Sequence, residues 1–154
     1  MYLVDTNVLS AAAPTQAAAT PELVAWMDRN SADLYLSVIT IAEIEAGIAK
    51  SRRQGAYRKA ERLAEWLAAL LHLYGGRIVS VDLDVARHLG CLIDRTREQG
   101  RKPDLADLAI AATALCHGWT VLTRNLRHFS PLGVPAHDPF MSLPTGVPGP
   151  STGS

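Results

Sequence analysis

The stretch Tyr2-Leu-Val-Asp-Thr-Asn-Val-Leu-Ser10 decides the fold of this chain. Three residues suited to a buried strand run directly into Asp5. Thr6 and Asn7 are typical of a helix start, because their side chains can cap the free N–H groups of a first turn. Asp5 is therefore expected where a strand ends and a helix begins, and in open α/β sheets this carboxyl edge is where ligands bind. Two interpretations stay open: Asp5 caps the helix, or it holds a ligand.

Length and composition indicate one globular domain. The chain of 154 residues is long enough for one compact core, and 48% of its residues are apolar. The 15 basic residues balance the 15 acidic ones, which excludes a general positive coating but allows a local basic patch beside an acidic pocket. From Pro144 the composition turns to Pro, Gly, Ser and Thr. We expect a domain over residues 1–143 and a flexible tail over residues 144–154.

The chain has the features of a soluble cytoplasmic protein. Cys91 and Cys116 lie in segments that favour helices and are most simply buried thiols in a reducing compartment. No CxxC or Cys/His spacing indicates zinc. The chain begins without the basic and apolar segments of a signal peptide. Its longest apolar run, around Trp66 to Leu73, is too short and too interrupted to span a bilayer.

Strands and helices are predicted to alternate along the chain. Strands are expected over residues 2–4, 33–38, 77–81 and 120–123, with an edge strand from Pro135. Helices are expected over residues 7–13, 21–30, 40–51, 57–73, 84–98 and 104–116, and a loop or broken turn over residues 126–134. This alternation predicts a parallel sheet with helices on both faces.

Asp107 is the most informative of the acidic residues. Its helical neighbours at i+3, i+4 and i+7 are Ile110, Ala111 and Ala114, so it begins an otherwise apolar stripe. No Lys or Arg lies one turn away on that face, and burying an unpaired charge is costly. Either a metal ion shared with other carboxylates balances this charge, or the N–H groups and the dipole of the helix N-terminus hold it.

Two further acids are ambiguous on their own. Asp104 follows Pro103 and precedes Asp107 by three residues, so capping of the helix is its expected role. Glu43 lies off an apolar helical stripe among small neighbours, and by itself it fits a solvated surface acid.

The acids become informative when they are taken together. Asp5 ends the first strand, Glu43 is expected in the first turn of the helix after the second strand, and Asp107 in the first turn of the helix before the fourth. In a doubly wound sheet these regions can meet at one edge. Three hard oxygen donors there fit Mg²⁺, with Mn²⁺ as the other candidate, because both ions also accept phosphate oxygens. Such an ion lowers the pKa of a bound water and stabilises charge on a phosphodiester.

Four segments carry a resemblance to a known family. They are Leu3-Val-Asp-Thr-Asn-Val-Leu9, Leu36-Ser-Val-Ile-Thr-Ile-Ala-Glu-Ile-Glu-Ala-Gly47, Ala106-Asp-Leu-Ala-Ile-Ala-Ala-Thr-Ala114 and Val121-Leu-Thr-Arg-Asn125. In this order they resemble the PIN-domain family, and within it the VapC-type toxins of type II toxin–antitoxin systems, including the FitB-like branch. The resemblance implies a three-layer α/β/α sandwich with a central parallel sheet. It also implies metal-dependent endoribonuclease activity and a cognate VapB-like antitoxin that occludes the site.

By this resemblance the three acids of the family fall on Asp5, Glu43 and Asp107, as catalytic residues and metal ligands. A fourth acid often follows the Thr-Arg pair, where this chain has Asn125. Relatives with Asn there often carry Asp three residues later, where this chain has His128. We therefore expect one tightly bound Mg²⁺, with Asn125 orienting a water through its amide. His128 could accept a proton or contact a phosphate, and an ordinary loop histidine is the alternative.

An RNA substrate needs positive charge near an acidic pocket. Arg124 and Arg127 flank Asn125 and are the expected phosphate contacts, with Thr6 and His128 also expected at the substrate. The RNA target stays open, with tRNA one candidate. A second basic block is most simply a solvated helix face; its members are Lys50, Arg52, Arg53, Arg58, Lys59 and Arg62.

The chain has more large apolar residues than a thin sandwich easily covers. Part of this surplus is core, and part could form a groove for an amphipathic antitoxin helix. Toxins of the resembled family usually also form a homodimer, which could cover some of it. The residues concerned are Val8, Leu9, Trp26, Ile48, Leu63, Trp66 and Leu67.

Two other functions stay open. A catalytically weak PIN scaffold could act with its antitoxin in DNA-binding regulation, since the fourth acid is missing. A phosphohydrolase could use Asp5 as a nucleophile, but no second Asp follows two residues later to serve as its acid.

Overall fold

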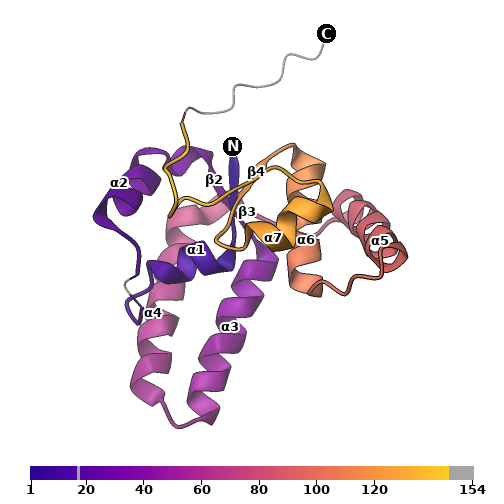
Figure 1. Ribbon diagram of the computed structural model, residues 1–154. Helices are drawn as coiled ribbons and strands as arrows, with labels where there is room; N and C mark the ends of the chain where they lie inside the picture. Colours follow the sequence, from indigo (N-terminus) through magenta and orange to yellow (C-terminus); the bar gives the residue numbers. More distant parts are fainter. Residues whose placement is uncertain (17, 146–154) are drawn as a thin grey trace.

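The computed structural model describes residues 1–16 and 18–145, which form one parallel five-stranded sheet with helices on both faces (Figure 1). The order of strands in the sheet is β3-β2-β1-β4-β5, and every neighbouring pair is parallel. The predicted α/β/α sandwich is confirmed, with β1 at its centre. The strands are β1 (Tyr2–Val4), β2 (Leu34–Ser37), β3 (Ile78–Val79), β4 (Thr120–Leu122) and β5 (Ala136–His137).

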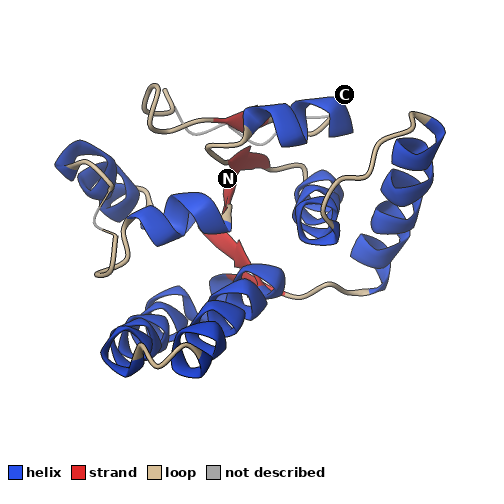
Figure 2. Ribbon diagram, turned by 60° about the horizontal axis from the view of Figure 1, so that its bottom comes forward, coloured by secondary structure: helices blue, strands red, loops and turns tan. Residues whose placement is uncertain are grey.

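Two groups of helices enclose the sheet, which Figure 2 shows between them. One group is α1 (Thr6–Ala11), α2 (Pro21–Arg29), α3 (Val38–Arg53) and α4 (Tyr57–Tyr74). The other is α5 (Leu83–Glu98), α6 (Leu105–His117) and α7 (Leu126–Phe129). Short 3-10 turns are η1 (Ser31–Asp33), η2 (Gly75–Arg77) and η3 (Ser130–Leu132). The helices α3 and α4 form a hairpin that extends away from the sheet (Figure 1).

Side chains alternate along the strands and so create two cores. In β1, Tyr2 and Val4 join the cluster formed with α1 to α4, whereas Leu3 joins the cluster formed with α5 to α7. The neighbouring strands follow the same rule, with Leu122 in the first cluster and Val121 in the second. Each fully buried side chain of this size stabilises the fold by about 1.5–3 kcal/mol. The two cores therefore pack against both faces of β1, and Asp5 follows this strand directly.

Three element boundaries differ from the predictions for physical reasons. The strand predicted over residues 33–38 ends at Ser37, because the Ser37 hydroxyl accepts the Ile39 N–H at 3.1 Å and caps α3. The helix predicted from Thr40 therefore begins two residues earlier. The first helix ends at Ala11 rather than Ala13. The predicted loop over residues 126–134 contains α7 and η3, because Phe129 and the nearby Leu132 are fully buried.

Two other predictions concern the surface and the end of the chain. The expectation of two buried thiols is wrong for Cys91, which is exposed, while Cys116 is partly buried. No helix within residues 1–16 and 18–145 is long and apolar enough to cross a membrane. The tail predicted over residues 144–154 lies, from residue 146 on, outside the described residues.

Candidate active site

Asp5 lies at the carboxyl end of the central strand, and only 4% of its surface is exposed. Its backbone is extended, and its Oδ1 accepts the N–H of Thr6 at 2.8 Å, so Asp5 caps α1. The prediction that Thr6 or Asn7 caps this helix is wrong, because the Asp5 carboxylate reaches the first free N–H group directly. The other oxygen, Oδ2, accepts the hydroxyl of Thr123 at 2.8 Å. Asp5 therefore both caps the helix and faces the site between β1 and β4.

The pKa of Asp5 is raised to about 6, and burial of the carboxyl is the largest cause of this shift. The hydrogen bonds from Thr123 and from the Thr6 N–H act in the opposite direction, because they stabilise the charged form. The nearby charges of Asp107 and Glu43 raise the pKa further. Glu43 on α3 and Asp107 on α6 therefore lie near enough to Asp5 for their charges to act on it, which is consistent with the predicted meeting of the three acids.

Thr6 holds Glu43 through a short hydrogen bond. The Thr6 hydroxyl donates to Glu43 Oε1 at 2.6 Å and lies 3.2 Å from the hydroxyl of the buried Thr40. A hydroxyl has one proton, so this donation leaves the Thr6 oxygen free to accept from Thr40. Glu43 lies in the second turn of α3 rather than in the first, because the helix begins at Val38.

Asp107 has a side-chain partner that was not predicted from the sequence. It lies in the first turn of α6, its side chain is 20% exposed, and its Oδ2 lies 3.1 Å from Nδ1 of His128 on α7. The inference that Asp107 is a buried charge without a protein partner is therefore wrong. The interpretation of His128 as an ordinary loop histidine is also wrong. Asp104 caps α6 through the Ala106 N–H, as predicted.

Thr123 and Asn7 also belong to the site, although neither was predicted as a site residue from the sequence. The Thr123 hydroxyl accepts the N–H of Asn125 at 3.0 Å and the amide of Asn7 at 3.4 Å, while it donates to Asp5. The Asn7 oxygen accepts the N–H of Arg124 at 3.1 Å. A buried hydroxyl at the end of a strand, two residues before a predicted site residue, is the signal that could have identified Thr123.

The predicted phosphate contacts lie around this network. Asn125 begins α7, and its backbone is held by Thr123. The guanidinium of Arg124 lies 4.5 Å from the centre of the Phe140 ring, which is a cation–π contact. Arg127 is exposed on α7, beside His128. The structure therefore brings two cations to the same side of the sheet as Asp5.

The oxygen donors of the site suit a hydrated divalent ion. In residues 1–16 and 18–145 the one contact of salt-bridge length joins Asp107 to His128, so no Lys or Arg forms an ion pair with Asp5 or Glu43. The same residues contain no ready cage of three or more His, Cys, Asp or Glu side chains. Mg²⁺ keeps several waters and binds through one or two carboxylates, so an open set of oxygen donors fits it.

The fold and the site define a class of protein, a doubly wound α/β domain with acids gathered at the carboxyl edge of its central strand. The chain belongs to the PIN domain family, whose profile matches residues 2–132. It is similar to the VapC ribonuclease Y4jK of Sinorhizobium fredii, with 35% identity over 148 residues, 91% of this chain and 98% of that protein. The toxin FitB of Neisseria gonorrhoeae is 34% identical over 144 residues, 91% of this chain and 99% of FitB.

A solved structure agrees with these relatives. The crystal structure of FitAcB from Neisseria gonorrhoeae matches with a TM-score of 0.77 and 35% identity, over 91% of this chain and 99% of that chain. The family resemblance inferred from four sequence segments is therefore confirmed.

Proposed function

We propose that this chain is the toxin of a type II toxin–antitoxin system, a Mg²⁺-dependent endoribonuclease that acts on RNA in the cytoplasm and is neutralised by a VapB-like antitoxin. One observation carries the proposal: the charges of Glu43 and Asp107 act on the buried Asp5, and in the described residues no Lys or Arg forms an ion pair with any of the three. Two relatives of nearly the same length, one named a ribonuclease and the other a toxin, support the same function.

The three carboxylates would hold the divalent ion. When bound, Mg²⁺ lowers the pKa of a water and neutralises charge on the phosphodiester, and Mn²⁺ can replace it. The protein's own contribution is to fix the carboxylates: Thr123 and the Thr6 N–H hold Asp5, and the Thr6 hydroxyl holds Glu43. Such preorganisation keeps the donors in place without cost at the moment of reaction.

His128 and Asn125 are placed for the remaining steps. An ionised Asp107 only accepts hydrogen bonds, so Nδ1 of His128 carries the proton between them. When the imidazole is doubly protonated, Nε2 of His128 also carries a proton, which it could donate to a phosphate oxygen or to the leaving oxygen when the P–O bond breaks. The amide of Asn125 would orient the attacking water, and Arg124 and Arg127 would attract the RNA backbone.

A cleavage assay with a matched control tests this proposal. Wild type, Asp5→Asn and Asp104→Asn are incubated with a panel of RNAs in Mg²⁺ or EDTA, and the cleavage ends are mapped. Asp5→Asn should lose at least about 100-fold in rate, since even changes around a metal ligand cost about 10–100-fold. Asp104→Asn should cleave like wild type, because Asn caps a helix as well as Asp does. Equal cleavage by wild type and Asp5→Asn would overturn the mechanism.

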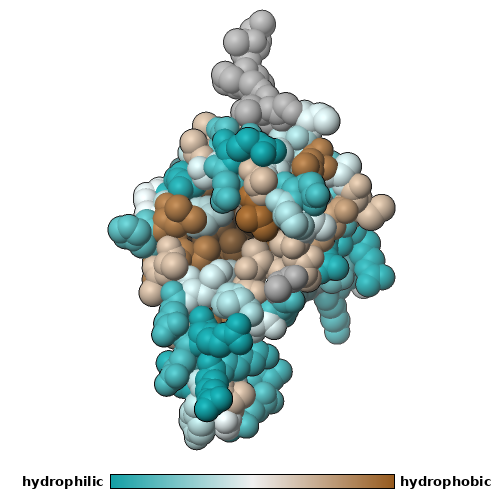
Figure 3. Space-filling model, turned by 90° about the vertical axis from the view of Figure 1, so that its left-hand side faces the viewer, coloured by the Kyte–Doolittle hydropathy of each residue, from teal (hydrophilic) through white to brown (hydrophobic). Residues whose placement is uncertain are grey.

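A groove on the side of α1 that faces away from Thr6 and Glu43 fits the antitoxin. Figure 3 shows a hollowed face on which hydrophobic side chains gather. The groove there lies between α1, α2 and α4 and has a volume of about 120 Å³. An amphipathic helix could place its apolar face in such a groove. The apolar lining residues are Leu9, Ala12, Val24, Met27, Trp66, Leu70, Leu73 and Tyr74.

The family resemblance also supports a homodimer, which light scattering on the purified protein would test. The alternative of a weak scaffold that regulates DNA binding has no observation here that favours it over the nuclease.

A further inference from the structure

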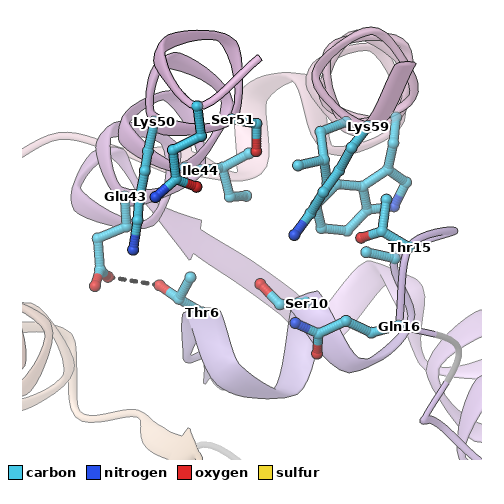
Figure 4. A pocket seen from close by; sticks show the side chains of 14 residues that line it. Thr6, Ser10, Thr15, Gln16, Glu43, Ile44, Lys50, Ser51 and Lys59 are labelled. Atoms are coloured by element: carbon cyan, nitrogen blue, oxygen red, sulfur yellow. Dashed lines mark hydrogen bonds between the residues drawn. The ribbon is translucent and has the colours of Figure 1, made fainter. Parts of the chain in front are cut away.

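A polar pocket of about 270 Å³ opens beside Glu43, between α1, α3, α4 and residues 13–16. Thr6 and Glu43 form one end of this pocket, so it is continuous with the candidate active site (Figure 4). Figure 4 shows Lys59 from α4 pointing toward Ser10 of α1, and Lys50 from α3 pointing toward Thr6 at the Glu43 end of the same pocket. The pocket is therefore a positively charged extension of an acidic site.

The two lysines form no ion pair in the described part of the chain. Within the described residues the ion pair of His128 with Asp107 is the only one, so neither Lys50 nor Lys59 forms one. Two unpaired amines that face the same pocket attract an anion. The formal net charge of the chain is zero, so this local charge is not part of a general positive coating. A diffuse attraction to anions therefore does not explain the pair.

The remaining walls suit a nucleotide rather than a small inorganic anion. Ser10, Gln16 and Gln54 contribute hydroxyl and amide groups, which can form hydrogen bonds with a base or a ribose. Trp66 and Leu63 contribute an apolar wall, and bases stack on aromatic side chains with little dependence on sequence. Amines, hydrogen-bonding groups and an aromatic wall in one pocket are the features of a site for single-stranded nucleic acid.

We propose that this pocket is a subsite for one nucleotide of the RNA, next to the bond that is cleaved. The phosphate of that nucleotide lies between Lys50 and Lys59, and its base lies against Trp66. This inference rests on the proposed ribonuclease function, because Glu43 places the pocket beside the reacting phosphate. An acidic segment of the antitoxin is the competing occupant of the pocket, and the test below separates the two.

Binding without metal tests the subsite independently of cleavage. Homopolymeric RNA oligonucleotides are titrated in EDTA into wild type, the double variant Lys50→Gln/Lys59→Gln and the control Arg53→Gln/Arg58→Gln. The control removes two charges from the same two helices, outside the pocket. The slope of log K against log salt should fall by about 0.7 for each lysine removed, which weakens binding about 25-fold at about 0.1 M salt. The control should change binding by less than about twofold, and both variants should keep the wild-type Tm.

A modified substrate locates the contact on the RNA. In the RNA that wild type cleaves, phosphates around the cleavage site are replaced one at a time by uncharged methylphosphonates. One replacement beside the cleaved bond should weaken the binding of wild type but not weaken that of the lysine variant any further. Coupling at a single position is expected for a direct contact and not for long-range attraction, which falls off over about 10 Å at this salt concentration.

The outcomes separate the two proposals. The proposed subsite is wrong if both double variants bind RNA equally, or if the lysine variant loses affinity for the antitoxin and not for RNA. Neither result contradicts the proposed nuclease activity. If wild type cleaves no RNA, the proposed function is wrong, and the binding measurement in EDTA still decides whether the pocket takes a nucleotide.

Discussion

Asp5 performs two tasks that usually fall to different residues. One carboxylate oxygen caps α1 and the other accepts the Thr123 hydroxyl, so the side chain is fixed before any ligand binds. Its burial among like charges is unfavourable for the fold but useful for a cation site, because an arriving cation removes the repulsion from Glu43 and Asp107. Stability and function therefore oppose each other at this residue.

Without metal, the ionised form of Asp5 should destabilise the protein. Its pKa rises from 3.8 to about 6 on folding, so between these values the folded state binds a proton more tightly than the unfolded chain does. The free energy of unfolding then falls as the pH rises through this window, by at most about 3 kcal/mol. Urea denaturation in EDTA from about pH 4 to pH 7 measures this decline. The decline should be smaller for Asp5→Asn, and equal pH dependence of the two proteins would contradict the assignment.

Thr123 is a positioning residue for Asp5. Thr123→Val keeps the shape but removes the hydroxyl that bonds to Asp5, Asn7 and Asn125. Loss of this buried donor should cost about 1–3 kcal/mol of stability, and it should lower kcat more than it changes KM. The matched control is Thr113→Val on α6, whose buried hydroxyl bonds to the Ala109 carbonyl, away from the site. If the two variants have equal kcat, Thr123 has no special role in activity.

At the scale of elements, α2 and α4 leave an apolar groove between them that residues 1–16 and 18–145 do not fill. Val24 and Leu73 line it and are 40% and 60% exposed. The variant Val24→Glu/Leu73→Glu should bind the cognate antitoxin at least about tenfold more weakly, because charges at a buried contact lack partners. RNA cleavage by the free variant should stay unchanged.

The control for the groove is Leu83→Glu on α5, a residue that is 76% exposed and outside the groove. Calorimetric titration of the antitoxin into each variant measures the effect. Equal loss of affinity in the groove variant and in the control, or no loss in either, would exclude this groove as the docking site.

At the scale of the whole molecule, metal binding should be linked to unfolding. An ion that binds the folded state alone stabilises it by about 1.4 kcal/mol when its concentration is ten times its Kd. For a domain of this size that corresponds to about 3–5 °C in Tm. Thermal unfolding in MgCl₂, compared with NaCl of equal ionic strength, should show this increase for wild type. An equal increase in Asp5→Asn would mean that Mg²⁺ binds elsewhere.

Local patterns predicted most of the fold. Caps and side-chain periodicity act over a few residues, so they can be predicted from the sequence. They predicted the strand before Asp5, the capping of α6 by Asp104 and the alternation of strands and helices. The places of Asp5, Glu43 and Asp107 in the predicted sheet gave the expectation that they lie together, and the family resemblance supported it. The effect of Glu43 and Asp107 on the pKa of Asp5 is consistent with this expectation. Their role as metal ligands stays a prediction.

The sequence by itself thus determined the architecture, because caps and side-chain periodicity are local, and it predicted which acids belong to the site. Only the tertiary structure decided how the acids are held. Thr123 contacts Asp5 although the two residues are 118 positions apart in the sequence, and His128 contacts Asp107 across 21 positions. Such partners depend on where separately packed elements meet, and no local periodicity carries that information. The same reason explains why the lysine pocket beside Glu43, built from α1, α3 and α4, looked in the sequence like a solvated helix face.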